Sequence, residues 1–449
     1  MIIPHLYFIH ISITPTQATE EKLRIKFATA YFLVNSLNQD DACRKATYYI
    51  KKFGWEVKKV ERTAFVSKDE SLTDDVLSKL FEDAERDGIA WRFESYDESL
   101  AEVKMVEMSG GISIDKKAFH QKSKSISKKR TCLHFEAGDS CDQYISAHSI
   151  QRSQCLQPIA RDGHVYQVDM ENISKSGKVS YKLTGINKAS TFFGFCKSHD
   201  NTLFEEIDNK LLIPSNKQAI LYAYRAICKE ISTKQKAIET LELQMRLSPE
   251  NSVEYKFAEE NKAGMAYGLK QLLRIKENYD KSLKSDRYED IEWVAFCCTD
   301  KPNVSFSGLI YPDYDFQGRP LQTFSNREAD LSLITFSFAP METGWSVLFA
   351  WHKSCEHVAS FYISSIAELM KQGRDLGSAL FNLVVLNCEN HAFSPNWWEC
   401  LDTQKKELIQ NIMTEQADAL SSINPLYLAK EIEGVVDWSF NSIYDSRSS

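Results

Sequence analysis

The sequence predicts a multidomain protein that combines α/β and α+β units. Its 449 residues exceed the size at which a single hydrophobic core keeps growing. The hydrophobic fraction of 43% and the aromatic fraction of 12% are typical of a folded chain. Changes in apolar period and charge divide the chain into five segments: a small α/β domain (1–112), a basic linker (113–130), a module containing cysteine and histidine (131–210), a helical hairpin (211–285) and an α+β domain (286–449).

The N-terminal segment alternates strand and helix patterns. The sequence "ATAYFLV" and the sequence starting at Trp55 predict strands, and Ile89, Trp91 and Phe93 alternate as in a half-buried strand. Helices are predicted over 39–53 and 73–88, and Asn38 is a candidate cap for the first. This order predicts helices packed on one sheet. Because the segment lacks a glycine-rich phosphate loop, we expect it to serve binding or association.

The basic linker separates this unit from the module. Six lysines and one arginine lie between Asp115 and Arg130, without an apolar period. From Asp115 to Asp200 the chain has 14 Lys and Arg against 8 Asp and Glu, whereas the whole chain carries a net charge of −8. This concentration of positive charge is suited to nucleic-acid phosphates. A solvated basic linker explains it equally well.

The remaining segments are predicted from periodicity. Apolar residues follow helical spacing from 216 to 247, and "SPE" at 248–250 separates this helix from a second one that reaches about 285. Such a hairpin either packs within the chain or pairs with a second copy or another protein. Farther on, Ile334, Phe336 and Phe338 alternate, as do the residues after Trp345, which predicts a β-hairpin. Helical patterns fill the rest of the C-terminal segment.

The sequence indicates a reducing compartment. Eleven cysteines are an odd number scattered over a long chain, unlike a secreted disulfide framework. The apolar N-terminus lacks the basic leader and cleavage site of a signal peptide, and no run of about 18 apolar residues occurs. We therefore expect a cytoplasmic location and no membrane partner.

Three cysteines and one histidine in the module form a candidate zinc site. Cys132 and Cys141 flank a turn at Gly138, and Cys196 and His199 have the spacing of a metal knuckle. Three thiolates and an imidazole are a closed tetrahedral set that suits structural Zn²⁺, and its binding would help a short module to fold. His134 is an alternative to Cys132, and buried cysteines without a metal are the other interpretation.

These motifs resemble the zinc-bound HNH (ββα-metal) endonuclease module. The resemblance covers Cys132 to about Asp208 and includes His-x-Ile at 148–150 and the Cys-x-x-His knuckle before a helix. The sequences "AHSIQ", "DGHVY" and "FCKSHD" also resemble uncharacterised bacterial proteins associated with phage defence. The resemblance implies cleavage of nucleic acid, with DNA expected over RNA.

The resemblance also implies residue roles. His148 would be the general base, and Asp200 would help to hold Mg²⁺ or Mn²⁺ for catalysis. Three departures stand against this. Ala147 occupies a position that often supplies a metal ligand, and Asn187 is too far from Cys196 to match the family asparagine. A hairpin-like insertion over 164–183 also makes the spacing between His148 and Cys196 longer than usual. His148 therefore has two other interpretations, as a residue that orients the zinc shell or as a zinc ligand in place of His199.

Three functions follow from these alternatives. The first is metal-dependent endonuclease activity. The second is a non-catalytic, zinc-stabilised component that binds nucleic acid or protein within a larger assembly. The third is a purely structural role, with the helical hairpin acting as a dimerisation rod.

Overall fold

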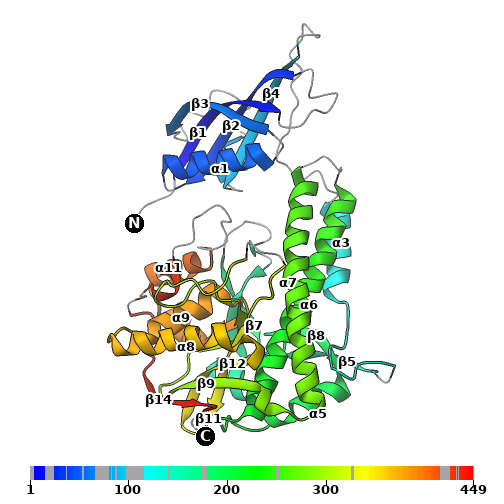
Figure 1. The fold of residues 1–449 in the computed structure, drawn as a ribbon, viewed down its shortest axis with the longest axis vertical. Helices are drawn as coiled ribbons and strands as arrows, with labels where there is room; N and C mark the ends of the chain where they lie inside the picture. The colour runs from blue at the N-terminus through cyan, green and yellow to red at the C-terminus, as the bar shows by residue number, and fades with distance from the viewer. Residues whose placement is uncertain are drawn as a thin grey trace.

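The chain is a mixed α/β protein with two separately packed parts. The computed structural model describes residues 5–15, 25–36, 38–52, 55–65, 80–81, 83–85, 88–97, 116–139, 141–170, 172–173, 179–248, 253–324, 328–414, 425–430, 432 and 434–447. One hydrophobic core runs from Ala147 to Trp438, and separate clusters lie within the N-terminal part. Figure 1 shows the N-terminal sheet at one end of the molecule, near the tip of two long helices.

The N-terminal part is a four-stranded antiparallel sheet in the order β3-β1-β2-β4. Its elements are β1 (His5–Pro15), β2 (Ile25–Ser36), α1 (Gln39–Lys52), β3 (Trp55–Phe65) and β4 (Ile89–Asp97). The Asn38 side chain accepts a hydrogen bond from the Asp41 N–H at 2.9 Å, which confirms the predicted cap. The sequence did not predict β1, although it is a central strand. Of the predicted helix over 73–88, residues 80–81, 83–85 and 88 lie within the described residues; 80–81 and 83–85 are helical, and Gly88 lies in a bend.

The predicted basic linker contains a helix. Residues Lys116–Ser127 form α3, which contacts the long helix α6 (Asn216–Leu247). Phe119, Ser123 and Ile126 are its half-buried side chains, whereas Lys122 and Lys124 are exposed. These three side chains recur at helical spacing, and packing of one face against a longer helix stabilises a short helix that would be marginal alone. The segment predicted as a basic linker thus contains a helix over 116–127.

An eight-stranded antiparallel sheet joins segments that the sequence placed in different domains. Its order is β14-β9-β12-β11-β10-β13-β6-β7. The strands are β6 (His164–Val168), β7 (Tyr181–Gly185), β9 (Ile291–Cys298), β10 (Val304–Ile310), β11 (Ile334–Met341), β12 (Gly344–His352), β13 (His391–Phe393) and β14 (Phe440–Asp445). The hairpin β6–β7 comes from the module, yet β6 pairs with β13. The boundaries predicted at 210 and 285 therefore do not separate independent cores.

The predicted β-hairpin is present as β11 and β12, with Phe336 opposite Phe349. Both faces of these strands are buried, rather than one as the alternation suggested. Helix α6 contacts β9, β10, β11 and β12, while α8 (Glu356–Lys371) and α9 (Leu376–Asn387) contact β12 and β10. Helices on both faces explain why Ser337 and Ser346 are buried beside the aromatic residues.

The two long helices predicted on either side of the break at 248–250 are α6 and α7 (Val253–Lys284), which lie side by side (Figure 1). Ser215 caps α6 by accepting a hydrogen bond from the Gln218 N–H. From Gln218 to Cys228 every residue of α6 is buried, so this half belongs to the main core. The hairpin is therefore part of the larger unit and not a separate rod.

The module contains a second, two-stranded sheet followed by a helix. Strand β5 (Tyr144–His148) pairs antiparallel with β8 (Thr191–Cys196), and α5 (Lys197–Asp208) starts directly after β8. Both β8 and α5 contact α6. The rest of the fold comprises α10 (Pro395–Cys400), α11 (Thr403–Thr414) and short helical turns at Arg152–Leu156, Gln157–Ile159, Tyr288–Asp290, Lys353–Cys355 and Tyr427–Ala429. Within the described part of the chain, no helix combines the length and the apolarity that a membrane span requires.

Candidate metal centre and adjacent cavity

The fold brings the four predicted zinc ligands together. Cys132 lies in the loop after α3, which is tied to β8 by a hydrogen bond from the Leu133 N–H to the Gly194 carbonyl. Cys141 follows the predicted turn, in which its N–H donates to the Gly138 carbonyl. Cys196 caps α5, and His199 lies in the first turn of that helix. The ligand atoms of these four residues lie within 4.8 Å of one another.

The distances within this cluster are those of a tetrahedral site. The Sγ atoms of Cys132, Cys141 and Cys196 lie 3.5, 3.4 and 3.3 Å from His199 Nδ1. With Zn–S bonds of about 2.3 Å and Zn–N bonds of about 2.0 Å, tetrahedral S and N ligands lie about 3.5 Å apart. One imidazole nitrogen has a single hydrogen or a single lone pair, so it cannot bond to three thiols at once. A cation between the four atoms would account for the arrangement.

Burial alone favours the neutral thiol at this position. It raises the pKa of the Cys132 thiol to about 11, because removal from water disfavours the thiolate. A bound cation would reverse this preference, since metals coordinate the deprotonated sulfur. The loop is also anchored to the core. The Tyr224 hydroxyl donates to the Leu133 carbonyl at 2.9 Å and contacts Asp280 at 2.7 Å.

His134, the predicted alternative to Cys132, lies beside the cluster. Its ring stacks on His199 with 4.0 Å between centroids and 3° between planes. Its Nδ1 accepts a hydrogen bond from the Glu136 N–H, so the neutral ring has its proton on Nε2 and lacks a lone pair there. Burial lowers the pKa of His134 to about 4, which keeps the ring neutral. His134, Glu136 and His199 form a second possible grouping, but this tautomer does not suit metal binding.

The two predicted catalytic residues line one cavity, of about 240 Å³. His148 is the last residue of β5, and Asp200 lies in the first turn of α5. Strand β5 pairs with β8 although 42 residues intervene between them, and His148 lies opposite Thr191 at the start of β8. Helix α5 leaves the other end of β8 and contacts β5, and Asp200 lines the same cavity as His148. The other lining residues are Ile145, Ser146, Ala147, Gln151, Arg152, Ser153, Asp208, Asn209 and Arg225.

His148 is held in a defined orientation. Its Nε2 lies 2.9 Å from the Ile186 carbonyl oxygen, which only accepts hydrogen bonds. The proton of the neutral ring is therefore on Nε2, and Nδ1 keeps its lone pair. Burial lowers the pKa of His148, opposed in part by the Ile186 carbonyl and aided by the charge of Arg152. Among the described residues, Nδ1 has no hydrogen-bond partner.

Asp200 is a buried carboxylate with an unused oxygen. Only 8% of the residue is exposed, and Oδ1 has no hydrogen-bond partner among the described residues. Burial raises the pKa of Asp200 to about 6, although the nearby Arg225 guanidinium acts in the opposite direction. Arg225 is itself paired through both terminal nitrogens with Asp208, at 2.6 and 2.8 Å. An unpartnered oxygen beside a cavity is suited to a ligand that enters it.

Asn390, which the sequence did not identify as a site residue, stabilises the loop after His148 through hydrogen bonds. Asn390 Nδ2 donates to Ser149 Oγ at 3.2 Å and to the Ser307 carbonyl at 3.0 Å. Its Oδ1 accepts from Ser190 Oγ at 2.7 Å, and Ser190 Oγ in turn accepts from the Ile150 N–H. Asn390 precedes β13, far away in sequence. Only the pairing of distant strands brings it to this loop.

A larger neighbouring cavity of about 690 Å³ shares Arg152 and Ser153 with the first. Arg152, His164 and Lys188 contribute exposed nitrogen groups to it. Asn187 does not lie with the predicted ligands, and its Oδ1 accepts a hydrogen bond from Arg152 at 2.9 Å. The lining of the two cavities therefore combines these basic groups with the carboxylates of Asp162, Asp200 and Asp208.

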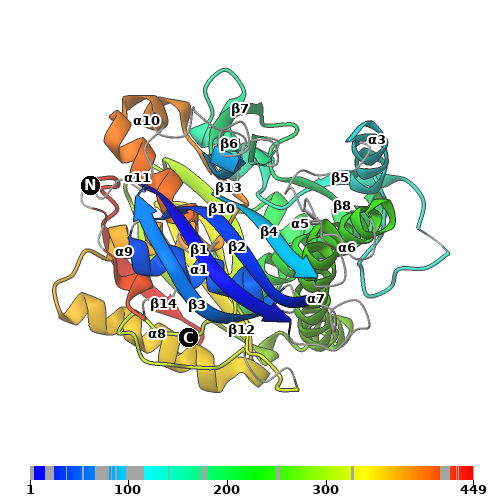
Figure 2. The same cartoon turned by 90° about the horizontal axis from the view of Figure 1, so that it is seen from above.

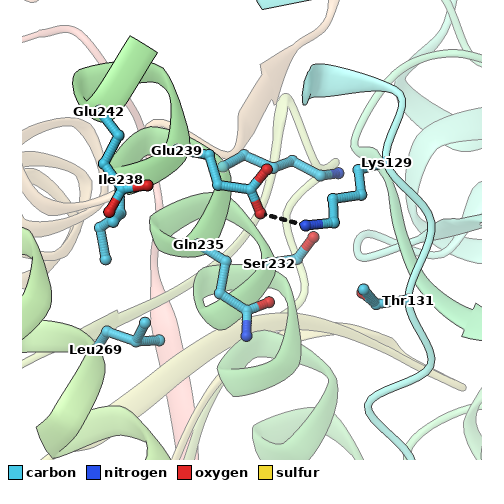
Figure 3. A pocket seen from close by; sticks show the side chains of 9 residues that line it. Lys129, Thr131, Ser232, Gln235, Ile238, Glu239, Glu242 and Leu269 are labelled. Carbon is cyan, nitrogen blue, oxygen red and sulfur yellow. Dashed lines mark hydrogen bonds and ion pairs between the residues drawn. The ribbon is translucent and has the colours of Figure 1, made fainter. Parts of the chain in front are cut away.

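Among the residues that the structure describes, other clusters of polar or metal-binding side chains do not form comparable centres. Figure 3 shows a cavity of about 320 Å³ beside α6, where Lys129 and Glu239 form an ion pair at 2.6 Å and neutralise each other. Cys388 and His391 lie close together in the sequence, and both side chains are hydrogen-bonded within the core. Cys388 Sγ donates to the Ser307 carbonyl, and His391 bonds to Tyr181 and to the Cys388 carbonyl.

Comparisons of the chain with protein-family models, with curated proteins and with solved structures find no match.

Proposed function

We propose that the protein is a metal-dependent endonuclease whose active site is the cavity lined by His148 and Asp200. The observation that carries this proposal is their convergence on one cavity from the end of β5 and the start of α5. We further propose that Cys132, Cys141, Cys196 and His199 hold a structural Zn²⁺ at the base of α5. The order of β5, β8 and α5 supports an HNH-like arrangement with the hairpin β6–β7 inserted between the strands.

His148 has the features of a general base. Its Nε2–H is engaged with the Ile186 carbonyl, which leaves Nδ1 to accept a proton from water. The lowered pKa keeps the ring neutral at pH 7, so it is ready to accept that proton. Attack of the resulting hydroxide on phosphorus would break the phosphodiester bond and release an oxygen leaving group.

Asp200 is the residue that would hold a catalytic cation. Mg²⁺ is bound in many sites by one or two carboxylates together with waters and substrate phosphates, so a single carboxylate is compatible with it or with Mn²⁺. Such a cation supplies positive charge that stabilises the departing oxygen. Arg152, on the rim shared by both cavities, is placed to contact a phosphate of the strand.

The test is cleavage of supercoiled plasmid and single-stranded DNA with Mg²⁺ or Mn²⁺. His148→Ala is expected to lower the rate by about 10²–10⁴-fold, the usual contribution of a general base, with zinc content and folding retained. The matched control is His164→Ala, an exposed histidine on the rim of the neighbouring cavity, which should keep most of the activity. Equal activity in wild type and His148→Ala would exclude this role for His148.

One observation favours a second function, a zinc-stabilised binding module without catalysis. Ala147 lies in the cavity wall beside His148 and offers no ligand, so Asp200 is the one carboxylate among the described lining residues that is not in an ion pair. This function predicts binding of DNA that weakens as salt rises, with no turnover at any divalent cation concentration.

A further inference from the structure

The larger of the two neighbouring cavities, of about 690 Å³, is formed by three segments that hydrogen bonds hold together. These segments are the helical turns over 152–157, the turn at 162–164 where β6 begins, and the loop over 185–188 at the end of β7. Figure 2 shows β6 and β7 beyond β13 at one end of the large sheet. The Ile186 N–H donates to the Gly163 carbonyl at 2.9 Å, which ties the loop to the turn. Arg152 Nη1 donates to Asn187 Oδ1 at 2.9 Å, which ties the helical turns to the same loop.

The loop after β7 also belongs to the candidate active site. Its Ile186 carbonyl accepts the hydrogen bond from His148 Nε2 at 2.9 Å, and the next residue, Asn187, holds Arg152. Arg152 and Ser153 line both cavities. A nucleic-acid strand with one phosphate beside His148 would therefore place an adjacent nucleotide in the larger cavity.

Several polar groups that line the larger cavity are free to bind a ligand. The exposed side chains of Gln157, Asp162 and Lys188 have no hydrogen-bond or ion-pair partner among the described residues. The neighbouring Arg161 forms no ion pair with Asp162, because both of its terminal nitrogens are bonded to Glu399, at 2.6 and 2.5 Å. The cavity thus offers an unpaired cation, an unpaired carboxylate and an unpaired amide.

The Asp162 carboxylate is carried by a turn of defined shape. Arg161 and His164 are joined by two backbone hydrogen bonds, so Asp162 and Gly163 form a two-residue hairpin loop. Their φ angles of 50° and 71° are those of a type I′ turn, for which Asp-Gly is a favoured sequence. His164 Nδ1 donates to the Asp162 carbonyl at 2.8 Å and so stabilises the turn. Such a turn limits the positions that the carboxylate can take at the cavity.

Resting on the proposed function, we propose that this cavity binds one unpaired nucleotide next to the phosphate that is cleaved. Lys188 and Arg152 supply positive charge for the phosphate of this nucleotide. A carboxylate only accepts hydrogen bonds, so Asp162 favours a base with an exocyclic amino group, such as cytosine, over thymine. The volume lies within the range of about 300–1,000 Å³ that is usual for pockets enclosing small ligands. A paired nucleotide would have to leave the duplex to enter. Single-stranded nucleic acid is therefore the substrate class.

The experiment measures binding of the zinc-loaded full chain to labelled single-stranded oligodeoxynucleotides by fluorescence anisotropy, without added Mg²⁺ or Mn²⁺. Lys188→Ala is expected to weaken binding about fivefold in about 50 mM salt and to make the salt dependence shallower by about 0.7, the effect of one lost phosphate contact with a single strand. The matched control is Lys182→Ala. Lys182 is a lysine of the same hairpin that is paired with Asp169 at 2.6 Å and lines neither cavity, so its loss should change affinity much less.

The role of Asp162 is tested by base preference. The wild type should bind oligo(dC) at least about fivefold more tightly than oligo(dT), the low end of discrimination by one well-placed contact to a base. Asp162→Asn should reduce this preference, because an amide also donates hydrogen bonds and asparagine tolerates the positive φ of the turn. Lys182→Ala should keep the preference of the wild type.

These binding measurements need no turnover, so they separate this inference from the cleavage proposal. Equal cleavage by wild type and His148→Ala would remove the proposed role of His148 and would leave the binding results as they are. The inference is overturned if the wild type binds no single strand or does not prefer oligo(dC). It is also overturned if Lys188→Ala and Lys182→Ala lose affinity equally, if Asp162→Asn keeps the preference, or if a blunt duplex competes as well as a single strand.

Discussion

At the scale of single residues, His199 decides the geometry of the metal centre. It is the common neighbour of three sulfur atoms that come from two distant parts of the chain. Its Nδ1 faces the sulfurs, while its ring is covered on one side by His134. Such packing fixes ring orientation and selects which nitrogen is presented to a cation.

The first prediction concerns Cys196, which is buried and begins α5. Cys196→Ser is expected to abolish zinc binding and to lower the free energy of unfolding by at least about 3 kcal/mol, because zinc binding contributes directly to folding. Metal analysis of the purified chain and denaturant unfolding check both effects. Cys400→Ser, at an exposed cysteine, should change neither. Full zinc retention in Cys196→Ser would contradict the assignment.

The second prediction concerns His391, which is fully buried with its neutral ring bonded at both nitrogens. Burial lowers its pKa to about 4, from about 6.5 in an unfolded chain. Between pH 6.5 and pH 4 the unfolded state binds one more proton at His391 than the folded state does. The contribution of neutral His391 to the free energy of unfolding is therefore complete above pH 6.5 and is lost as the pH falls toward 4. The loss reaches up to about 3 kcal/mol.

His391→Gln should therefore flatten the dependence of unfolding free energy on pH between 6.5 and 4, even if it lowers stability at pH 7. Denaturant unfolding at several pH values measures this slope. His164→Gln, at an exposed histidine, should leave the slope as it is in the wild type. An unchanged slope in His391→Gln would show that another group controls stability in this range.

At the scale of elements, α6 connects the metal module with the large sheet. Its first half is buried on all sides, and Arg225 in that half pairs with Asp208 at the end of α5. The guanidinium also lies 4.0 Å from the centroid of the Phe204 ring. Through this residue α6 fixes the helix that carries both His199 and Asp200.

Arg225→Met is expected to cost about 3 kcal/mol of unfolding free energy, because it leaves the Asp208 carboxylate without its partner in a partly buried position. Denaturant unfolding at pH 7 measures the loss. The pair of Lys210 and Glu206 is more exposed, so Lys210→Met should cost no more than about 0.5 kcal/mol. Equal losses in the two variants would mean that the buried pair contributes no more than a surface pair.

The sequence predicted the location of helices and strands better than it predicted how they pack together. Apolar residues at helical spacing indicated α6, the break at 248–250 indicated that α7 follows it, and alternation indicated β11 and β12, because these signals arise within one continuous segment. Helix α3 was missed because only Phe119 and Ile126 give it an apolar face. The apolar N-terminal residues that form β1 also fit the composition of a targeting signal, so composition did not identify the strand.

At the scale of the whole molecule, the N-terminal sheet and the larger unit have separate cores. The contacts between them include Lys52, which pairs with Glu260 of α7 at 2.7 Å and lies 5.4 Å from the centroid of the Phe257 ring. A single ion pair contributes little compared with a shared core. We therefore expect the two parts to unfold independently.

Phe32→Ala tests this independence. Phe32 is fully buried in the N-terminal core, and its truncation should cost about 3–5 kcal/mol there. Hydrogen–deuterium exchange should then increase in residues 5–97 while the larger unit keeps its protection. Phe336→Ala should give the converse pattern, with faster exchange in the larger unit. Increased exchange throughout the chain in both variants would show that the two parts unfold together.

The sequence alone determined the chemistry that is available and most of the local structure. The three cysteines and His199 could be named because each half of the set has a recognisable local spacing and distinctive side chains, whereas His148 and Asp200 were named from the resemblance to the HNH module. Only the tertiary structure decided which of them meet. Sheet pairing joined β6 to β13, brought Asn390 to the loop after His148, and merged three predicted segments into one core. Contacts between distant segments depend on packing of the whole chain, and periodicity within one segment carries no information about them.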